Sequence, residues 1–275
     1  MTSNAALSEE HLDYLLEKVY TTKGWDFRRY RRSSIKRCVE RRIAISKRSY
    51  HTYVELLDSE PLEFNHLFGH ITIKVSEFFR DPEVFRRIED YVIPMSLRRL
   101  TVTGSTDLRI WSCGCARGEE PLSMAILINK RLKERGDKPD LKIFGTDIDE
   151  SAVNSARNGV FIEDSLKNVD PYMRSQFFQA SKSAFQIIPQ IRNLVTFGVH
   201  DIVSHIQLSR MDIILCRNLL IYFEKELQEK VFEKFYYSLK PGGFIVLGKS
   251  EVPPLRFRNN LIEVCKREKI YQKGT

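Results

Sequence analysis

Apolar residues in the first third of the chain recur at the spacing that places them on one face of a helix. Ile35, Val39 and Ile43 are each four positions apart, and no strand pattern occurs before residue 107. We therefore predict a small helical domain over residues 1–80. A linker helix and loop follow over residues 81–106, with the helix starting at Asp81-Pro82 and running towards Pro94.

From residue 107 onward, short apolar runs alternate with amphipathic segments. The apolar runs predict buried strands at residues 108–112, 141–146, 195–197, 211–216 and 244–247. The amphipathic segments predict helices at residues 119–134, 150–157 and 224–239, and a closing hairpin is predicted at residues 261–264 and 269–271. Strands that alternate with helices form a parallel sheet covered on both faces, so residues 107–275 are predicted to adopt an α/β, Rossmann-like fold.

The composition is ordinary for a globular protein, with 42% hydrophobic and 29% charged residues. No apolar run approaches the roughly 18 residues that a membrane span needs, and the first residues lack the pattern of a signal peptide. We therefore expect a cytoplasmic protein that is not embedded in a membrane.

The cysteines and histidines do not predict a metal site. Cys113 and Cys115 are too close together and too isolated for zinc, and the five cysteines follow no framework spacing. His66 and His70 have a spacing that can bind metal on a helix, but no third ligand lies near them. We predict that no metal is bound.

The net charge of +8 is concentrated in one segment. Residues 28–48 contain ten Lys or Arg side chains and a single acid, Glu40. Such a segment indicates an anionic partner, which could be a nucleic acid, an anionic membrane surface or an acidic protein, unless it is only a solvated helix face.

The segment WSCGCARGEEP at residues 111–121 follows the first predicted strand and opens the next helix. A glycine-bearing turn between a strand and a helix lets backbone N–H groups approach a ligand closely. Gly114 and Gly118 flank this turn, and Glu119 and Glu120 open the helix. Acids there repel a pyrophosphate, and the spacing is not that of a dinucleotide site. The turn therefore predicts an adenosyl ligand that bears an amine.

Further candidate ligand contacts follow the later strands of the predicted sheet. Asp147 ends the second strand, where a carboxylate can accept both ribose hydroxyls, whereas Asp149 is expected to cap a helix. Asp201 and Ile202 follow the third strand and are expected to bracket an adenine. The fourth strand leads into CRNLLIYF at residues 216–223, in place of the [DN]PP[YF] motif of many nucleic-acid N-methyltransferases. Base methylation is therefore disfavoured.

Together these motifs resemble one family, the chemotaxis receptor methyltransferases of the CheR type. The resemblance covers about residues 10–272, and the order and spacing of its motifs match throughout. The matching segments are KVSEFFRDP at 74–82, WSCGCARGEEPLS at 111–123, TDID at 146–149, LCRNLLIYF at 215–223 and LKPGGFIVLGKSE at 239–251.

The resemblance implies an enzyme that transfers a methyl group from S-adenosylmethionine to glutamate side chains on the cytoplasmic signalling helices of chemoreceptors. The product of the cofactor is S-adenosylhomocysteine. A glutamate is already ionised at neutral pH, so in-line placement in a dry cleft can supply most of the catalysis without a general base. The implied fold is a Rossmann-like class I methyltransferase sheet with an N-terminal all-α domain and a small antiparallel β-subdomain inserted at about residues 160–194. We expect a monomer.

The resemblance also implies roles for individual residues. Arg80 and Tyr222 are expected to lie close together at the methyl-transfer site. The basic helix is expected to bind the acidic receptor helices through Arg28, Arg32, Lys36 and Arg41. The expected cofactor-binding residues are Lys74, Ser76, Arg80, Gly114, Glu119, Glu120, Asp147, Ile148, Asp201, Ile202, Arg217 and Asn218.

The chain departs from the family pattern at several positions. Lys74 and Ser76 replace an Asn and a Thr, and Arg117 replaces a small residue in the glycine turn, from which it must point outward. Some members dock on a pentapeptide at the receptor C-terminus through a glycine-containing turn, whereas residues 179–184 are short and lack glycine. We therefore predict direct substrate recognition without this tether. A nucleic-acid methyltransferase and a catalytically silent cofactor-binding regulator remain the alternatives.

Overall fold

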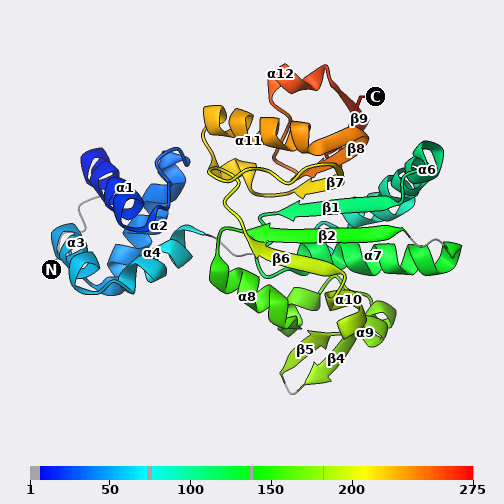
Figure 1. Ribbon diagram of the computed structural model, residues 1–275. Helices are drawn as coiled ribbons and strands as arrows, with labels where there is room; N and C mark the ends of the chain where they lie inside the picture. Colours follow the sequence, from blue (N-terminus) through cyan, green and yellow to red (C-terminus); the bar gives the residue numbers. More distant parts are fainter. Residues whose placement is uncertain (1–6, 73–75, 137–138, 182, 275) are drawn as a thin grey trace. The chain divides into compact units, whose positions relative to one another are not determined.

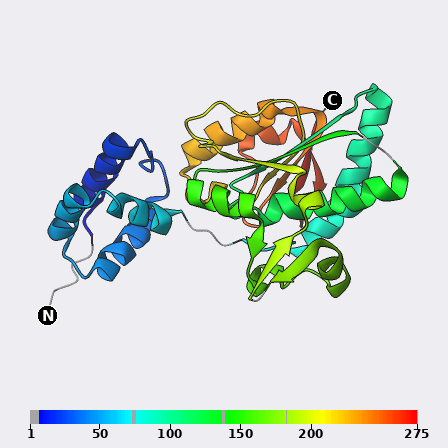
Figure 2. The ribbon, with the colours of Figure 1, turned by 60° about the horizontal axis from the view of Figure 1, so that its bottom comes forward.

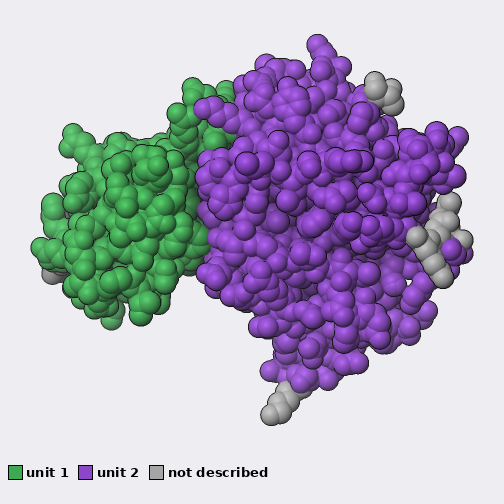
Figure 3. Space-filling model, viewed as in Figure 1, with its two compact units in different colours: residues 1–73, 222–227 green, residues 74–221, 228–275 purple. Residues whose placement is uncertain are grey.

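The computed structural model describes residues 7–72, 76–136, 139–181 and 183–274. The chain forms two compact units (Figure 1, Figure 3). Residues 1–73 and 222–227 make up the N-terminal unit, and residues 74–221 and 228–275 make up the sheet unit. The division between them falls at residue 73, a few positions before the expected end of the helical domain.

The N-terminal unit is built from four helices whose apolar faces meet in a common core. The helices are α1 (Glu9–Lys23), α2 (Arg32–Ser46), α3 (Tyr50–Ser59) and α4 (Glu63–Ile71). The Ser8 hydroxyl caps α1 by accepting the His11 N–H at 3.1 Å, and Gly24 ends α1 with a left-handed φ of 74°. Of the predicted core positions of α2, Ile35 and Val39 are buried and Ile43 is half-buried, which confirms the helical periodicity of this region.

A short segment from much later in the chain completes the N-terminal unit. The Arg31 N–H donates to the Tyr222 carbonyl at 2.8 Å, and the Glu224 N–H donates to the Arg29 carbonyl at 3.1 Å. Tyr30 and Phe223 pair between these bonds, with their rings edge to face at 4.9 Å. This local antiparallel pairing explains why residues 222–227 group with the helices.

The sheet unit contains a seven-stranded sheet in the order β6-β2-β1-β7-β8-β10-β9. Its strands are β1 (Asp107–Cys113), β2 (Asp140–Asp147), β6 (Val195–Val199), β7 (Met211–Cys216), β8 (Leu239–Leu247), β9 (Leu261–Cys265) and β10 (Ile270–Lys273). The first five are parallel, and β10 and β9 form the expected closing hairpin at one edge. The α/β prediction is therefore confirmed.

Helices cover both faces of this sheet, as Figure 2 shows for α7 and α11. The crossover helices are α7 (Glu119–Arg135), α8 (Glu150–Asn158) and α11 (Lys225–Ser238), and the short helices α10 (Pro189–Arg192) and α12 (Leu255–Arg258) lie in the connections. Strand order reverses between β1 and β7. Ligands of open α/β sheets bind where the order reverses, beyond the carboxyl ends of the strands.

The segment after residue 81 differs from the sequence prediction. Helix α5 (Pro82–Arg87) continues through a π turn (Ile88–Val92) into α6 (Ile93–Thr103), so the expected end near Pro94 is wrong. The Ile93 N–H bonds to the Ile88 carbonyl, and this wider turn lets the helix pass the proline, which has no N–H to donate. Val84, Ile88 and Leu97 are buried in the core of the sheet unit, so residues 82–103 pack as part of that unit.

Strand β8 also begins earlier than the sequence predicts. The expected strand started at Phe244, whereas β8 begins at Leu239 and includes the Lys-Pro-Gly-Gly segment. A register shift opposite Met211–Ile213 and a left-handed φ of 72° at Gly242 accommodate this irregular start.

The expected inserted β-subdomain is present as a three-stranded antiparallel sheet in the order β3-β5-β4. Its elements are β3 (Val160–Phe161), a 3-10 turn (Glu163–Leu166), α9 (Pro171–Phe177), β4 (Phe178–Ser181) and β5 (Ala184–Ile187). Ser181 pairs with Ala184, so only two residues connect β4 and β5. Phe161 and Phe178 pack edge to face on Phe78, with ring centroids 4.8 and 4.9 Å apart.

Among the described helices, none is long and apolar enough to cross a membrane.

Candidate functional site

The turn between β1 and α7 is a succession of left-handed residues. Gly114, Ala116 and Gly118 have φ angles of 73°, 48° and 92°. A Cβ on Gly118 would lie 2.8 Å from the Ala156 Cβ and 2.9 Å from the Phe197 ring, so this position has no room for a side chain. Arg117 is exposed, which confirms that it points outward.

The two acids that open α7 have different surroundings. Glu120 accepts the Ser112 hydroxyl at 2.8 Å and an Arg217 N–H at 3.2 Å. Glu119 is 1% exposed, and its Oε2 has no hydrogen-bond partner among the described residues. Burial raises the pKa of Glu119, although backbone and hydroxyl contacts, including Ser76, oppose this. The charge of Arg117 also opposes the rise, but Glu119 forms no ion pair with a described residue. A ligand ammonium group would be a fitting partner for such a buried carboxylate.

Asp147 ties the end of β2 to the glycine turn. Its Oδ2 accepts the Ala116 N–H at 2.8 Å, and its Oδ1 accepts the Asp149 N–H at 3.0 Å. An ionised carboxylate at this place in an α/β fold is the type of group that accepts ribose hydroxyls. Asp149 caps α8 by accepting the N–H groups of Ser151 and Ala152, which confirms its expected role. Ile148 is half-buried between the two acids.

The loop after β6 contains the residues expected beside an adenine. Asp201 accepts the Val203 N–H at 2.9 Å and the Ser204 hydroxyl at 2.7 Å, and Ile202 is buried. The Lys234 ammonium donates to the carbonyls of Ile202, Val203 and His205 at 2.8 Å each. These hydrogen bonds hold the loop against α11, and both oxygens of the Asp201 carboxylate already accept bonds from the loop itself.

Arg217 joins three segments that are distant in sequence. Its side chain is 2% exposed. One terminal nitrogen donates to Glu120 at 3.2 Å, and the other donates to the Asp81 carboxylate at 2.5 Å and to the Arg80 carbonyl at 2.9 Å. Phe79 and Asp81, on either side of Arg80, have left-handed φ angles of 51° and 58°. This network fixes the backbone of Arg80, whose own side chain is half-buried.

Of the expected cofactor-binding residues, Ser76, Glu119, Glu120, Arg80 and Arg217 are thus linked by contacts within the sheet unit. Lys74 lies outside the described residues. The sequence reasoning missed Ser123, whose hydroxyl accepts the Phe79 N–H at 3.0 Å and donates to the Glu119 carbonyl at 2.7 Å. Its only signal was its place at the end of the motif at residues 111–123.

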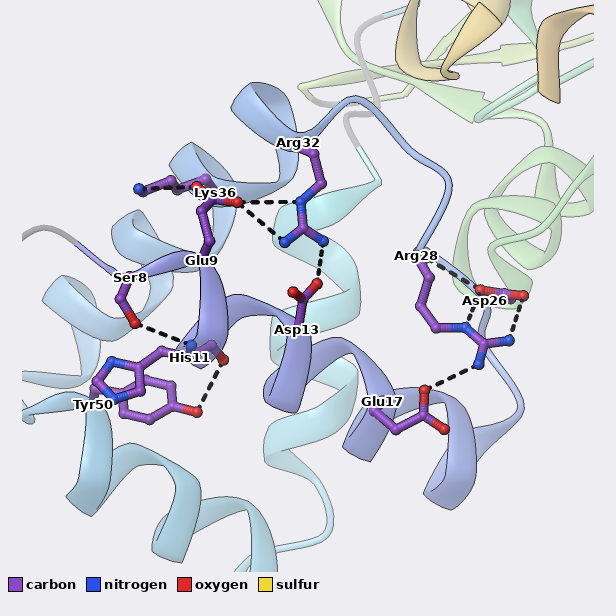
Figure 4. A network of polar contacts seen from close by, with 10 residues as sticks. All are labelled: Ser8, Glu9, His11, Asp13, Glu17, Asp26, Arg28, Arg32, Lys36 and Tyr50. Carbon is purple, nitrogen blue, oxygen red and sulfur yellow. Dashed lines mark hydrogen bonds and ion pairs between the residues drawn. The ribbon is translucent and has the colours of Figure 1, made fainter. Parts of the chain in front are cut away.

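Two groups of basic residues in the N-terminal unit concern the expected receptor contacts, and one of them faces α1 (Figure 4). Glu9, Asp13 and Glu17 are four positions apart on α1 and pair with Arg28, Arg32 and Lys36 at 2.6–3.3 Å. Three of the four expected substrate-binding side chains therefore already contact carboxylates of the same unit. Exposed pairs of this kind contribute little to stability and can exchange partners.

The other group surrounds a cavity of about 320 Å³ in the N-terminal unit. Its lining residues are Tyr30, Ser34, Ile35, Arg37, Cys38, Arg41, His70, Ile71 and Tyr222. Arg37 and Arg41 are exposed, and Arg41 forms no ion pair with a described residue. Burial and the positive charges of Arg42 and Arg41 lower the pKa of His70. The cavity thus combines two arginines with Tyr222, whereas Arg80 belongs to the sheet unit.

The thiols near the site are unsuited to nucleophilic chemistry. Cys113, Cys115 and Cys216 are buried, and burial raises the pKa of each thiol. A thiolate is the reactive form of cysteine, so these side chains act as small apolar groups.

The buried polar atoms at the carboxyl ends of the strands fit S-adenosylmethionine. Glu119 Oε2, Arg217 Nε and Asn218 Oδ1 are buried without hydrogen-bond partners among the described residues. Such atoms are rare in proteins, and a ligand with an ammonium, a carboxylate and hydroxyl groups can satisfy them.

Comparisons with known proteins agree with this geometry. Residues 10–72 match the CheR methyltransferase all-alpha domain, and residues 74–269 match the CheR methyltransferase SAM-binding domain. The chain is 32% identical over 96% of its length to an uncharacterised 104.1 kDa protein of Rhodobacter capsulatus, of which it spans only 27%.

Shorter relatives align over nearly their whole length. The chemotaxis protein methyltransferase of Listeria innocua is 31% identical over 89% of this chain and 90% of its own. That of Escherichia coli K12 is 28% identical over 91% of this chain and 87% of its own. The chain belongs to the CheR family of methyltransferases and uses S-adenosylmethionine as its methyl donor.

Proposed function

We propose that the protein methylates glutamate side chains on acidic cytoplasmic helices of chemoreceptors. The observation that carries this proposal is the cavity of the N-terminal unit, where Arg37 and Arg41 lie with Tyr222. Two guanidinium groups favour a carboxylate, and the relatives of similar length from Listeria innocua and Escherichia coli are named as chemotaxis protein methyltransferases. The N-terminal unit then binds the acceptor, and the sheet unit binds the donor.

S-adenosylmethionine supplies an electrophilic methyl group, which passes to a carboxylate oxygen as the C–S bond breaks and leaves S-adenosylhomocysteine. The chain then has only to bind and align the two reactants, because the acceptor is already ionised. We propose that Glu119 binds the donor ammonium, Asp147 the ribose and Ile202 the adenine. Arg80 and Tyr222 are proposed to contact the reacting groups.

The basic residues that we propose as the main substrate contacts are only partly those expected from the sequence. Arg28, Arg32 and Lys36 pair with the acids of α1, whereas Arg37 and Arg41 do not. We therefore propose Arg37 and Arg41 as the principal contacts of the receptor carboxylates, and the ion-paired group as a weaker second set.

The proposed substrate is tested by incubating the protein with labelled S-adenosylmethionine and receptor-containing membranes. Label that mild base releases from the receptor would identify carboxyl methyl esters. Transfer of the label to nucleic acid would instead support a nucleic-acid methyltransferase. Binding of S-adenosylhomocysteine without transfer to any substrate would support a catalytically silent regulator.

The acceptor site is tested by Arg37→Glu and Arg41→Glu. Each is expected to reduce receptor methylation strongly and to leave S-adenosylhomocysteine binding unchanged. Arg98→Glu, an equally large charge change at an exposed position of α6, is the matched control. Equal methylation by all three variants would contradict the proposed site.

We further propose that the receptor is recognised directly, by a monomer, without a C-terminal tether. The pairing of Ser181 with Ala184 supports this, because it leaves only two positions of sequence between β4 and β5. Tight calorimetric binding of a receptor C-terminal pentapeptide would refute it.

A further inference from the structure

We infer that Glu251 is a positioning residue for the donor site, through the loop that follows β7. The inference rests on the proposed function and on the expected contact of the donor with Arg217 and Asn218, whose buried Nε and Oδ1 atoms have no partner among the described residues. Glu251 lies just after β8, is 4% exposed, and forms no ion pair with a described residue. Such a buried acid requires other partners.

The partners of Glu251 are backbone N–H groups. Its Oε2 accepts the Gly248 N–H at 2.7 Å and the Asn218 N–H at 3.0 Å, and its Oε1 accepts the Ile221 N–H at 3.3 Å. Burial raises the pKa of Glu251, but these bonds and one from the Leu220 backbone favour its ionised form. The carboxylate therefore joins the end of β8 to residues 218–221.

The Glu251 carboxylate can approach the backbone closely because of the residues that it contacts, Gly248 and Asn218. A Cβ on Gly248 would lie 2.7 Å from Glu251 Oε2 and 2.8 Å from the Asn218 nitrogen. Asn218 has a left-handed φ of 60°, a conformation that costs free energy for a residue other than glycine. The bond from the Asn218 N–H to Glu251 offsets this cost and holds the Asn218 backbone in this conformation.

The same loop borders the rest of the donor site. Arg217 precedes it and contacts Glu120 and Asp81. Leu219 packs against the glycine turn, with its Cδ2 3.2 Å from the place that a Cβ on Gly114 would occupy. A displaced loop would therefore disturb Arg217, Asn218 and the turn together, although Glu251 itself need not touch the donor.

The test compares Glu251→Gln with Glu63→Gln. Both remove the charge of a carboxylate that is at most 5% exposed, but Glu63 contacts Arg42 and Tyr53 in the N-terminal unit. In Glu251→Gln an amide NH2 must face backbone N–H donors, or one of them loses its acceptor. We expect a loss of S-adenosylhomocysteine affinity of about tenfold or more by calorimetry, the scale of one unsatisfied buried group.

Glu63→Gln is expected to lower the unfolding temperature and to keep the affinity of the parent protein. Amide exchange of Asn218 and Ile221 should accelerate in Glu251→Gln alone, and Glu251→Asp should recover part of the affinity. Unchanged affinity and exchange in Glu251→Gln, or equal losses in both glutamine variants, would overturn the inference. These measurements need no receptor. If the proposed receptor substrate is wrong, the parent protein would bind S-adenosylhomocysteine without methylating receptors, and that result is separate from the test of Glu251.

Discussion

Arg217 donates a hydrogen bond of 2.5 Å to the carboxylate of Asp81, 136 positions away in the sequence. Asp81 also contacts Lys249 at 2.7 Å. Burial tends to raise the pKa of Asp81, but the Lys249 hydrogen bond and the charges of Arg217, Lys249 and Arg80 outweigh it, so the pKa is lowered. The ion pair, together with the bond from Arg217 to the Arg80 carbonyl, thus holds the backbone of residues 80 and 81 in place.

We expect Arg217→Lys to lower the free energy of unfolding by about 1–3 kcal/mol, since an ammonium cannot reproduce the guanidinium fork that reaches Asp81, Glu120 and the Arg80 carbonyl. The affinity for S-adenosylhomocysteine should fall as well. Urea unfolding and calorimetry measure the two effects. Arg98→Lys makes the same exchange on an exposed surface and should change neither; equal behaviour of the two variants would argue against the network.

Glu119→Gln should separate stability from function. Because the pKa of Glu119 is raised on folding, the ionised side chain destabilises the folded state once the pH rises through that pKa. The variant should therefore unfold at a higher temperature than the ligand-free parent near neutral pH. The difference should disappear as the pH falls towards the ordinary value of 4.5.

The same variant should bind S-adenosylhomocysteine more weakly, because the ligand ammonium loses its carboxylate. Glu120→Gln is the control: Glu120 is already paired with Ser112 and Arg217, so its loss should lower stability. A stability loss in both variants would show that the backbone and hydroxyl contacts of Glu119 outweigh the cost of burying its charge.

Neutralising the acids of α1 should strengthen receptor binding. In the double variant Glu9→Gln, Asp13→Asn the side chains of Arg32 and Lys36 lose their intramolecular partners and become available to receptor carboxylates. We expect a lower KM for receptor-containing membranes at low salt and no difference at high salt, because exposed charges are screened. The unfolding temperature should change little. An unchanged KM at low salt would mean that these basic residues take no part in receptor binding.

Gly118→Ala should be much more harmful than Gly104→Ala. Both glycines have a left-handed φ, but a Cβ on Gly104 would have nothing within 4 Å, whereas one on Gly118 would collide with Ala156 and Phe197. We expect costs of about 1 kcal/mol for Gly104→Ala and about 2–5 kcal/mol for Gly118→Ala in urea unfolding. Similar costs would indicate that the turn relaxes freely.

Much of the architecture is a local property of the sequence. Alternating apolar runs and amphipathic segments predicted the parallel strands, the crossover helices and the closing hairpin, because burial of one face imposes its period on the chain. Asp147 ends a strand, Asp201 follows one, and Glu119 opens the helix after another, so all three lie towards the carboxyl ends of the parallel strands. The end of a helix at Pro94 was predicted wrongly, because a π turn relieved the proline locally.

The sequence by itself determined which residue types stand at the ends of the strands and that residues 28–48 are basic, since both follow from order along the chain. Only the tertiary structure decided that Arg217 would meet Asp81, that Glu251 would receive the N–H groups of residues 218–221, and that the acids of α1 would pair with Arg28, Arg32 and Lys36. These partners come from segments brought together by packing, and no local pattern specifies which charges will meet.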